Sequence, residues 1–261
     1  MNTDMTPLSA KALTVMVTGA TAGIGEATIK RFHEAGSTVI AVGRRRDRLL
    51  QLRLDCDDTR MHILELDVRD RAGLVTALDE LPTAFRNIDV LVNNAGTALG
   101  MEPAHLANWD DWEAMVDTNV KGVMNCVRAI LPRMCERDAG HIVNIGSAAG
   151  RYPYPGGNVY GGTKAFIQQF SLNLRADLLG RNIRVTSVEP GRVRTEVSLV
   201  RFKGDKRRAE EPYRGFQPLH PSDIAETIFW CATLPRHVNI NRVEVMPIAQ
   251  AFNPLRICRD E

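Results

Sequence analysis

The chain has 261 residues, of which 44% are hydrophobic and 25% are charged, as in an ordinary globular protein. A formal net charge of +2 gives no general attraction to nucleic acid or membrane surfaces, and no apolar run approaches the roughly 18 residues of a membrane span, so neither partner is expected. Five scattered cysteines lack close metal-ligand spacing, which predicts no metal site and favours reduced thiols in a cytoplasmic protein.

Short apolar runs alternate with segments of helical spacing along the chain after residues 1–10, which are polar and expected to be disordered. Alternation of this kind predicts an α/β Rossmann fold in one domain over residues 1–261, a doubly wound parallel sheet of about seven strands with helices on both faces. We expect strands at 12–17, 38–42, 61–66, 88–92, 141–145, 183–188 and 243–246. We expect helices at 26–35, 69–81, 111–131 (one long helix) and 165–179. Ligands of such sheets bind beyond the carboxyl ends of the strands.

A glycine-rich turn joins the first strand to the first helix, with the sequence Thr18-Gly19-Ala20-Thr21-Ala22-Gly23-Ile24-Gly25. Gly19 permits the tight turn, Gly23 lets backbone amides approach a pyrophosphate, and Gly25 lets the helix lie close to the strand. The spacing differs from the usual Gly-x-Gly-x-x-Gly, and a purely structural turn is the alternative. Its position favours dinucleotide binding by Gly19, Thr21, Gly23, Ile24 and Gly25.

Arginines follow the second strand, where NAD-binding chains usually carry a carboxylate for the ribose 2′-hydroxyl. Arg44 and Arg45 suit a 2′-phosphate instead, because guanidinium groups make forked, charge-assisted hydrogen bonds. A solvated basic loop is the alternative. The pattern predicts NADP(H) rather than NAD(H).

The next two strands also end in residues suited to a dinucleotide. Asp67-Val68 follows the third, where a carboxylate can accept a hydrogen bond from an adenine amine; Asp67 as N-cap of the 69–81 helix is the alternative. Asn93, Ala95 and Gly96 follow the fourth, and small residues let the backbone pass close to a ribose.

Tyr160 and Lys164 lie four residues apart at the start of the 165–179 segment, so on a helix they share a face. A phenol has a reference pKa of about 10, which a nearby cation lowers. Lowering the pKa to about 7 needs roughly 4 kcal/mol, more than one screened lysine supplies, so a second positive charge such as an oxidised nicotinamide would be a natural supplement. Taken alone, the Tyr-x-x-x-Lys pair is common and more typical of a plain helical surface than of a catalytic site.

The segment 192–221 is irregular, basic and rich in glycine and proline, and it follows the sixth strand on the ligand side. A long insertion there predicts a substrate lid. Arg192, Arg194 and Arg201 can pair with an acidic substrate, although a solvated basic surface is the alternative for each one.

Taken together, the motifs resemble the short-chain dehydrogenase/reductase family over roughly residues 12–250. Those that carry the resemblance are the 18–25 turn, Asn93-Asn94-Ala95-Gly96, Asn119, Ser147, Tyr160-x-x-x-Lys164 and Pro190-Gly191. The chain is most similar to the NADP-dependent 3-hydroxy acid (serine-type) dehydrogenases and sulfoacetaldehyde reductases, through the stretches 100–105, 152–160, 170–175, 201–205 and 238–241.

The resemblance implies a role for each matching residue. Tyr160 would be the general acid in reduction and the base in oxidation, Ser147 would hold the substrate oxygen, and Lys164 would bind the nicotinamide ribose and lower the phenol pKa. Asn119 would hold a backbone kink and a water linked to Lys164.

The resemblance also implies a full set of binding residues. The cofactor set adds Asp67, Val68, Asn93, Ala95, Gly96, Pro190, Val193 and Thr195, with Val193 and Thr195 at the nicotinamide carboxamide. The substrate set is Ser147, Asn158, Tyr160, Arg192 and Arg194. One departure is Ala22, where many NADP-using relatives carry a basic residue, so the cofactor preference depends on Arg44 and Arg45.

The predicted function is an NADP(H)-dependent oxidoreductase that interconverts a short hydroxy acid and its oxo form. Reduction of sulfoacetaldehyde or another small aldehyde is the alternative among enzymes, and an NADP-sensing binding protein is the alternative outside them. The resemblance further implies a homotetramer built on the 111–131 and 160–179 helices, whose apolar spacing is equally compatible with packing on the chain's own sheet. The sequence leaves open whether the basic tail with Arg256 and Arg259 reaches a neighbouring subunit's site.

Overall fold

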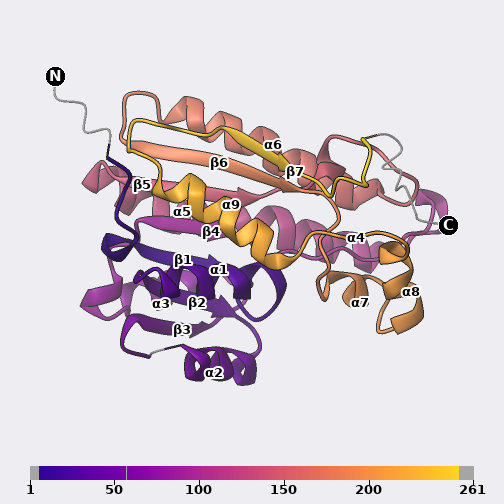
Figure 1. The fold of residues 1–261 in the computed structure, drawn as a ribbon, viewed down its shortest axis with the longest axis horizontal. Helices are drawn as coiled ribbons and strands as arrows, with labels where there is room; N and C mark the ends of the chain where they lie inside the picture. Colours follow the sequence, from indigo (N-terminus) through magenta and orange to yellow (C-terminus); the bar gives the residue numbers. More distant parts are fainter. Residues whose placement is uncertain (1–5, 57, 253–261) are drawn as a thin grey trace.

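Seven parallel strands form one central sheet in the computed structural model, which describes residues 6–56 and 58–252 (Figure 1). The strand order is β3-β2-β1-β4-β5-β6-β7, which confirms the predicted doubly wound sheet. The order reverses between β1 and β4, which places the ligand-binding crevice of such a sheet at their carboxyl ends. The strands are β1 (Thr14–Thr18), β2 (Thr38–Gly43), β3 (Met61–Glu65), β4 (Val90–Asn93), β5 (Gly140–Ile145), β6 (Ile183–Pro190) and β7 (Arg242–Val245).

Helices pack on both faces of the sheet, because successive strand side chains point to opposite faces. One core cluster joins Val15 and Val17 of β1 to the helices α1 (Gly23–Glu34), α2 (Arg46–Asp55) and α9 (Pro221–Thr233). The other joins Met16 to α3 (Arg71–Asp79), α5 (Gly122–Arg137) and α6 (Asn158–Asp177). Both faces of the sheet are therefore covered, as expected.

Helix α9 is absent from the predicted elements, although its sequence carries the usual signals. Pro221 occupies the first turn, and His220 and Asp223 form a reciprocal cap at the helix start. Ile224 and Ile228 recur four residues apart and are fully buried.

The predicted helix at 111–131 is interrupted. It consists of α4 (Trp109–Val116), a π-helical turn (Asp117–Lys121) and α5. The extra residue of the wider turn directs Asn119 inward, where its side chain is buried. Turns of this kind occur frequently at functional sites.

The segment 192–221 lies beyond the carboxyl ends of the strands, at the right in Figure 1. It contains two short helices, α7 (Val197–Arg201) and α8 (Lys206–Glu210), where the sequence suggested irregular structure. A parallel bridge between Val193 and Leu219 joins its two ends.

The first described residues are hydrogen-bonded to the rest of the fold: the Leu8 amide donates to Thr233 O (2.8 Å) and Ser37 Oγ donates to Ala10 O (2.7 Å). Residues 1–5 lie outside the described residues, so the disorder expected at 1–10 stays a prediction. The tail residues Arg256 and Arg259 lie outside the described residues.

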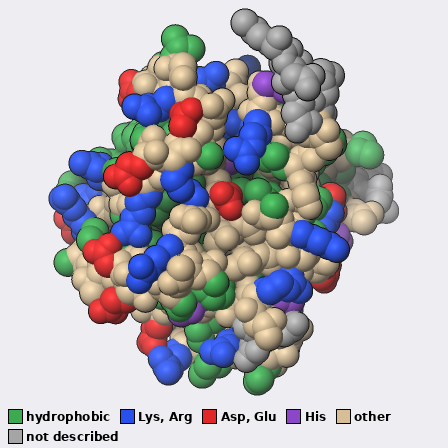
Figure 2. Space-filling view, turned by 90° about the vertical axis from the view of Figure 1, so that its left-hand side faces the viewer, with side chains coloured by type: hydrophobic (Ala, Val, Ile, Leu, Met, Phe, Trp, Pro, Cys, Tyr) green, Lys and Arg blue, Asp and Glu red, His purple; other side chains and the backbone are tan. Residues whose placement is uncertain are grey.

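The face at the amino ends of the strands carries basic and acidic side chains side by side (Figure 2). This mixture agrees with the small net charge of the chain. Across residues 6–56 and 58–252, no helix has the length and apolar character to cross a membrane.

Candidate active site

Two adjoining cavities lie at the carboxyl edge of the sheet. The first, of about 450 Å³, is lined by the glycine-rich turn and the ends of β2, β3 and β4. The second, of about 480 Å³, is lined by the end of β5, the start of α6 and the 192–221 segment. Both include Ile24, Asn94, Gly96, Thr97, Thr195 and Val197, so they form one continuous cleft.

The glycine-rich turn borders the first cavity in the conformation that the sequence predicts. Gly19 and Gly23 have φ values of 67° and 56°, which favour glycine. A Cβ on Gly25 would lie 2.5 Å from Asn94 Nδ2 and would overlap the Gly19 carbonyl oxygen. Ala22, at the N-cap of α1, offers no side-chain oxygen to the first-turn amides, so an anion can take that place.

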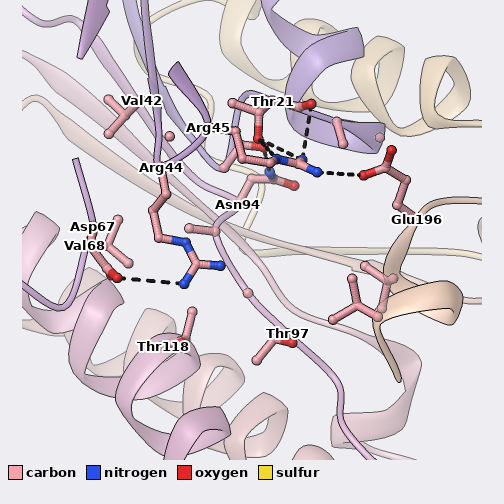
Figure 3. Close-up of a pocket in the computed structure, with 18 of the residues that line it drawn as sticks. Thr21, Val42, Arg44, Arg45, Asp67, Val68, Asn94, Thr97, Thr118 and Glu196 are labelled. Carbon is pink, nitrogen blue, oxygen red and sulfur yellow. Dashed lines mark hydrogen bonds and ion pairs between the residues drawn. The ribbon is translucent and has the colours of Figure 1, made fainter. Parts of the chain in front are cut away.

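The two arginines predicted to bind a 2′-phosphate point in different directions (Figure 3). Arg45 donates to Thr21 Oγ1 from Nε (3.0 Å) and from Nη2 (2.8 Å), and it pairs with Glu196 (2.9 Å). Arg44 extends along the cleft toward Asp67, 3.7 Å away, with 68% of its side chain exposed. Since an arginine follows β2 where a carboxylate would hold a 2′-hydroxyl, the cleft fits a dinucleotide with a 2′-phosphate.

At the end of β3, the structure contradicts one of the two roles predicted for Asp67, that of N-cap of the following helix. Asp70, not Asp67, caps α3 by accepting from the Gly73 amide (2.9 Å). Asp67 pairs with Arg69 (2.6 Å), whose hydrogen bond holds the pKa of that carboxyl below its ordinary value. Asp67 and Val68 both line the first cavity.

Asn93 lies apart from the other residues that follow β4. Its Nδ2 donates to Asn144 Oδ1 on β5 (2.8 Å), and its side chain is buried within the sheet. Ala95 and Gly96 line the first cavity, whereas Asn93 is not among its lining residues. The adjacent Asn94 lines both cavities and donates to Thr18 O (2.9 Å), which ties β4 to β1.

Ser147, Tyr160 and Lys164 converge on the second cavity. Ser147 follows β5, and the other two lie one turn apart on α6. Lys164 Nζ donates to Ile145 O (2.8 Å) and lies 6.0 Å from the Tyr160 ring centroid. Pro190, Val193 and Thr195 line the same cavity.

Asn119 sits behind this group rather than in the cavity lining. Its Oδ1 accepts from the Thr97 amide (2.8 Å), and its Nδ2 donates to Thr97 O (2.9 Å) and to Thr163 Oγ1 (3.0 Å). It therefore fastens the loop after β4 to α6 between Tyr160 and Lys164.

Burial is the main influence on the pKa values of the ionisable groups Tyr160 and Lys164 in this cavity. Burial raises the pKa of the Tyr160 phenol, against which hydrogen bonding by Ser147 and the charge of Arg201 act. Burial lowers the pKa of Lys164 to about 8. The phenol is therefore protonated at neutral pH in the protein alone, and the expected lowering of its pKa requires a further positive charge.

This arrangement of glycine-rich turn, serine, tyrosine and lysine has a counterpart among known proteins. The family model described as short chain dehydrogenase matches residues 13–205. The chain belongs to the short-chain dehydrogenase family. The resemblance predicted from its motifs is thereby confirmed.

Several relatives of this short-chain dehydrogenase match over nearly their whole length. The NADP-dependent 3-hydroxy acid dehydrogenase YdfG of Escherichia coli (strain K12) is 55% identical over 246 residues, 94% of this chain and 99% of that protein. Sulfoacetaldehyde reductase 2 of Chromohalobacter salexigens is 50% identical over 248 residues, 94% and 98% of the two chains. A solved structure of the closed form of serine dehydrogenase complexed with NADP+ superimposes with a TM-score of 0.91 at 55% identity, covering 95% of this chain and 100% of that one.

The arginines of the 192–221 segment predicted to bind an acidic substrate occupy three different environments. Arg201 lines the second cavity, where its guanidinium carbon lies 5.5 Å from the Tyr160 ring centroid and Nη2 donates to Tyr154 Oη (2.9 Å). Arg192 lines the same cavity. Arg194 pairs with Glu210 (2.7 Å) and is not among the lining residues.

Asn158 also lies outside the second cavity's lining. Its Oδ1 accepts from Trp112 Nε1 (3.1 Å), and its Nδ2 donates to Glu102 O (3.1 Å). Tyr154, absent from the predicted set, lines the cavity and contacts Arg201. The Tyr-Pro-Tyr-Pro stretch at 152–155, just before Tyr160, was the available signal.

Proposed function

We propose that this short-chain dehydrogenase is an NADP(H)-dependent oxidoreductase that interconverts a short 3-hydroxy acid and its oxo form. One observation carries the proposal: Ser147, Tyr160, Lys164 and Arg201 line a single cavity that continues into the dinucleotide cleft. The 55% identical NADP-dependent 3-hydroxy acid dehydrogenase named above supports the same activity.

Tyr160 is the proton-transfer group of the proposed mechanism. When bound, NADP(H) supplies the hydride chemistry. The phenol donates a proton to the substrate oxygen during reduction and takes one back during oxidation, while the Ser147 hydroxyl orients that oxygen. Lys164, held by Ile145 O, is placed to bind the nicotinamide ribose, and Asn119 fixes the backbone beside it.

The cofactor is proposed to lie along the continuous cleft. Arg44 is the better placed arginine for the 2′-phosphate, because Arg45 already bonds to Thr21 and Glu196. The adenine end is assigned to Asp67 and Val68. The pyrophosphate, ribose and nicotinamide positions are assigned to Gly19, Thr21, Gly23, Ile24, Ala95, Gly96, Pro190, Val193 and Thr195. Gly25 lines neither cavity and lets α1 pack against the turn.

Arg201 supports an acidic substrate. Its guanidinium carbon lies 5.5 Å from the ring centroid of the phenol that would meet the reacting oxygen, a spacing that suits a small molecule with a charged end. A sulfonate suits a guanidinium as well as a carboxylate does, so sulfoacetaldehyde reduction is the second candidate, favoured by the 50% identical reductase.

A substrate panel tests the proposed activity. Serine, 3-hydroxy acids, malonic semialdehyde, sulfoacetaldehyde and an uncharged aldehyde are compared by NADPH absorbance. Arg201→Met should raise KM for the charged substrates by about 10- to 100-fold, as for a lost charge-assisted hydrogen bond, and spare the uncharged one. Arg207→Met, on the exposed side of α8, is the control. Equal losses on both substrate types would contradict the role of Arg201.

A homotetramer in the cytoplasm is proposed for the assembly and location. Exposed apolar side chains on the outer side of α4, α5 and α6 support the assembly: Val116, Met124, Phe166 and Leu172. Light scattering on the purified protein tests it. The described cysteines Cys56, Cys126, Cys135 and Cys231 are free thiols, which supports a reducing compartment.

A further inference from the structure

Glu196, at the start of α7, pairs with two arginines of the β2–α2 region, of which Figure 3 shows Arg45. Its Oε2 pairs with Arg45 Nη1 (2.9 Å) and its Oε1 with Arg48 Nη1 (2.6 Å). These partners lie 151 and 148 residues away in the sequence. The 192–221 segment is thus joined to the opposite wall of the cleft by one carboxylate with two charged partners.

The same bridge includes the glycine-rich turn. Arg45 donates to Thr21 from both Nε and Nη2, so one guanidinium links Thr21 to Glu196. Next to Glu196, Thr195 lies directly over Gly23: its Cγ2 is 3.2 Å from the position that a Cβ on Gly23 would occupy. Thr195 and Glu196 therefore form a roof over the turn assigned to the pyrophosphate.

The bridge is separate from the arginine that extends into the cleft. Arg48 pairs with Glu196 but is not among the lining residues of the cavity, and Arg44 points away toward Asp67. A carboxylate whose role was to occupy the phosphate position would be expected to contact Arg44. The contacts of Glu196 instead fasten the roof to the wall.

We propose that Glu196 is a positioning residue that holds the Thr195 side of the lid closed over the bound dinucleotide and sets the rate at which the dinucleotide leaves. The inference rests on the proposed NADP(H) function. Because the roof covers the turn assigned to the pyrophosphate, which NADPH and NADH share, the bridge acts equally on both coenzymes. A residue acting on the 2′-phosphate would affect NADPH alone.

Two measurements on Glu196→Gln test the proposal. In stopped-flow fluorescence, the dissociation rates of NADPH and of NADH should both rise by about three- to tenfold, the range for losing two half-exposed ion pairs. In the coenzyme-free protein, tryptic cleavage within 192–214 should accelerate by a similar factor, because loss of the bridge favours local unfolding of the backbone around Arg201 and Lys203. The second measurement does not depend on turnover.

Two further variants complete the design. Glu65→Gln is the matched control: Glu65 pairs with the neighbouring Arg46 (3.1 Å) without touching the lid, and both rates should stay within about twofold of wild type. Arg48→Gln removes one of the two ion pairs and should give a smaller increase. Both coenzymes should dissociate from the double variant Glu196→Gln/Arg48→Gln no faster than from Glu196→Gln alone, because the two residues act as one unit.

The outcomes separate this inference from the function on which it rests. Unchanged dissociation and cleavage in both Glu196→Gln and Arg48→Gln overturn the inference, as does a change for NADPH without one for NADH. A folded wild-type protein that takes up neither coenzyme overturns the proposed function as well. Parallel increases in the dissociation rates of both coenzymes in Glu196→Gln, absent in Glu65→Gln, support the proposed role of Glu196.

Discussion

Replacing Gly25 with alanine tests how closely α1 must approach the end of β1. The added Cβ would overlap the Gly19 carbonyl oxygen, lie 2.5 Å from Asn94 Nδ2 and lie 2.9 Å from the Gly19 carbonyl carbon. Two of these atoms belong to a backbone with positive φ, and the third belongs to a side chain that donates to Thr18 O and Gly19 O. The neighbours therefore cannot move apart without loss of the turn.

The expected cost combines three effects. Overpacking in a tight site costs about 1–3 kcal/mol. Loss of the two Asn94 hydrogen bonds adds about 1 kcal/mol each, and the better helix propensity of alanine returns about 1 kcal/mol. The net loss of about 2–4 kcal/mol should lower Tm by about 5–15 °C in a chain of this size.

Gly162→Ala is the matched control, because a Cβ on Gly162 of α6 meets nothing within 4 Å. The same substitution should raise stability there by about 0.5–1 kcal/mol, since alanine is the better helix former. Differential scanning calorimetry of both variants, with NADPH titration, checks the pair. A Gly25→Ala protein that melts within about 2 °C of wild type and binds NADPH normally would refute the close-approach argument.

Three further predictions concern the cleft and the sheet. Tyr160→Phe should lower kcat by at least about 100-fold while NADPH affinity changes less than about twofold, as for loss of a general acid. Unchanged turnover would remove Tyr160 from the mechanism, whereas wild-type turnover that is lost in the variant while binding persists would exclude a pure coenzyme sensor. Arg44→Gln should reduce the NADPH-over-NADH preference in kcat/KM by about 10- to 100-fold, whereas Arg46→Gln, equally exposed at 68% but outside the cleft, should not; equal effects would contradict the assignment. Burial raises the pKa of Glu189 from 4.5 to about 7, so the folded protein retains a proton that the unfolded chain releases between these values, and stability falls as pH rises through that window. Glu189→Gln should therefore be more stable than wild type by about 2–3 kcal/mol at pH 8 and equal to it near pH 4, measured by urea unfolding; the same difference at both pH values would contradict the shift.

The sequence pattern predicts the architecture well, because the conformation of each helix or strand depends mainly on residues that are close together in the sequence. Apolar runs, the glycine-rich turn and Tyr160-x-x-x-Lys164 specify strands, a tight strand-to-helix turn and one helical face without reference to distant segments. Parallel strands then bring their carboxyl ends to one edge, which gathers Ser147, Tyr160 and Lys164. The π-helical turn at Asn119 was not predicted, because an extra residue in a turn leaves the apolar spacing on either side nearly unchanged.

Contacts between segments far apart in the chain decided the rest. Two adjacent arginines looked alike in the sequence, yet Glu196, 151 residues beyond Arg45, engages one of them and leaves the other in the cleft. Arg201 reaches the phenol ring because the 192–221 segment packs near the start of α6, whereas Arg194 turns to Glu210, 16 residues away within the same segment. The sequence by itself determined the fold and the family, since local patterns fix backbone conformation, and it predicted the catalytic group. The tertiary structure decided which charged side chains line the cleft, since long, flexible side chains take the partners that packing brings within reach.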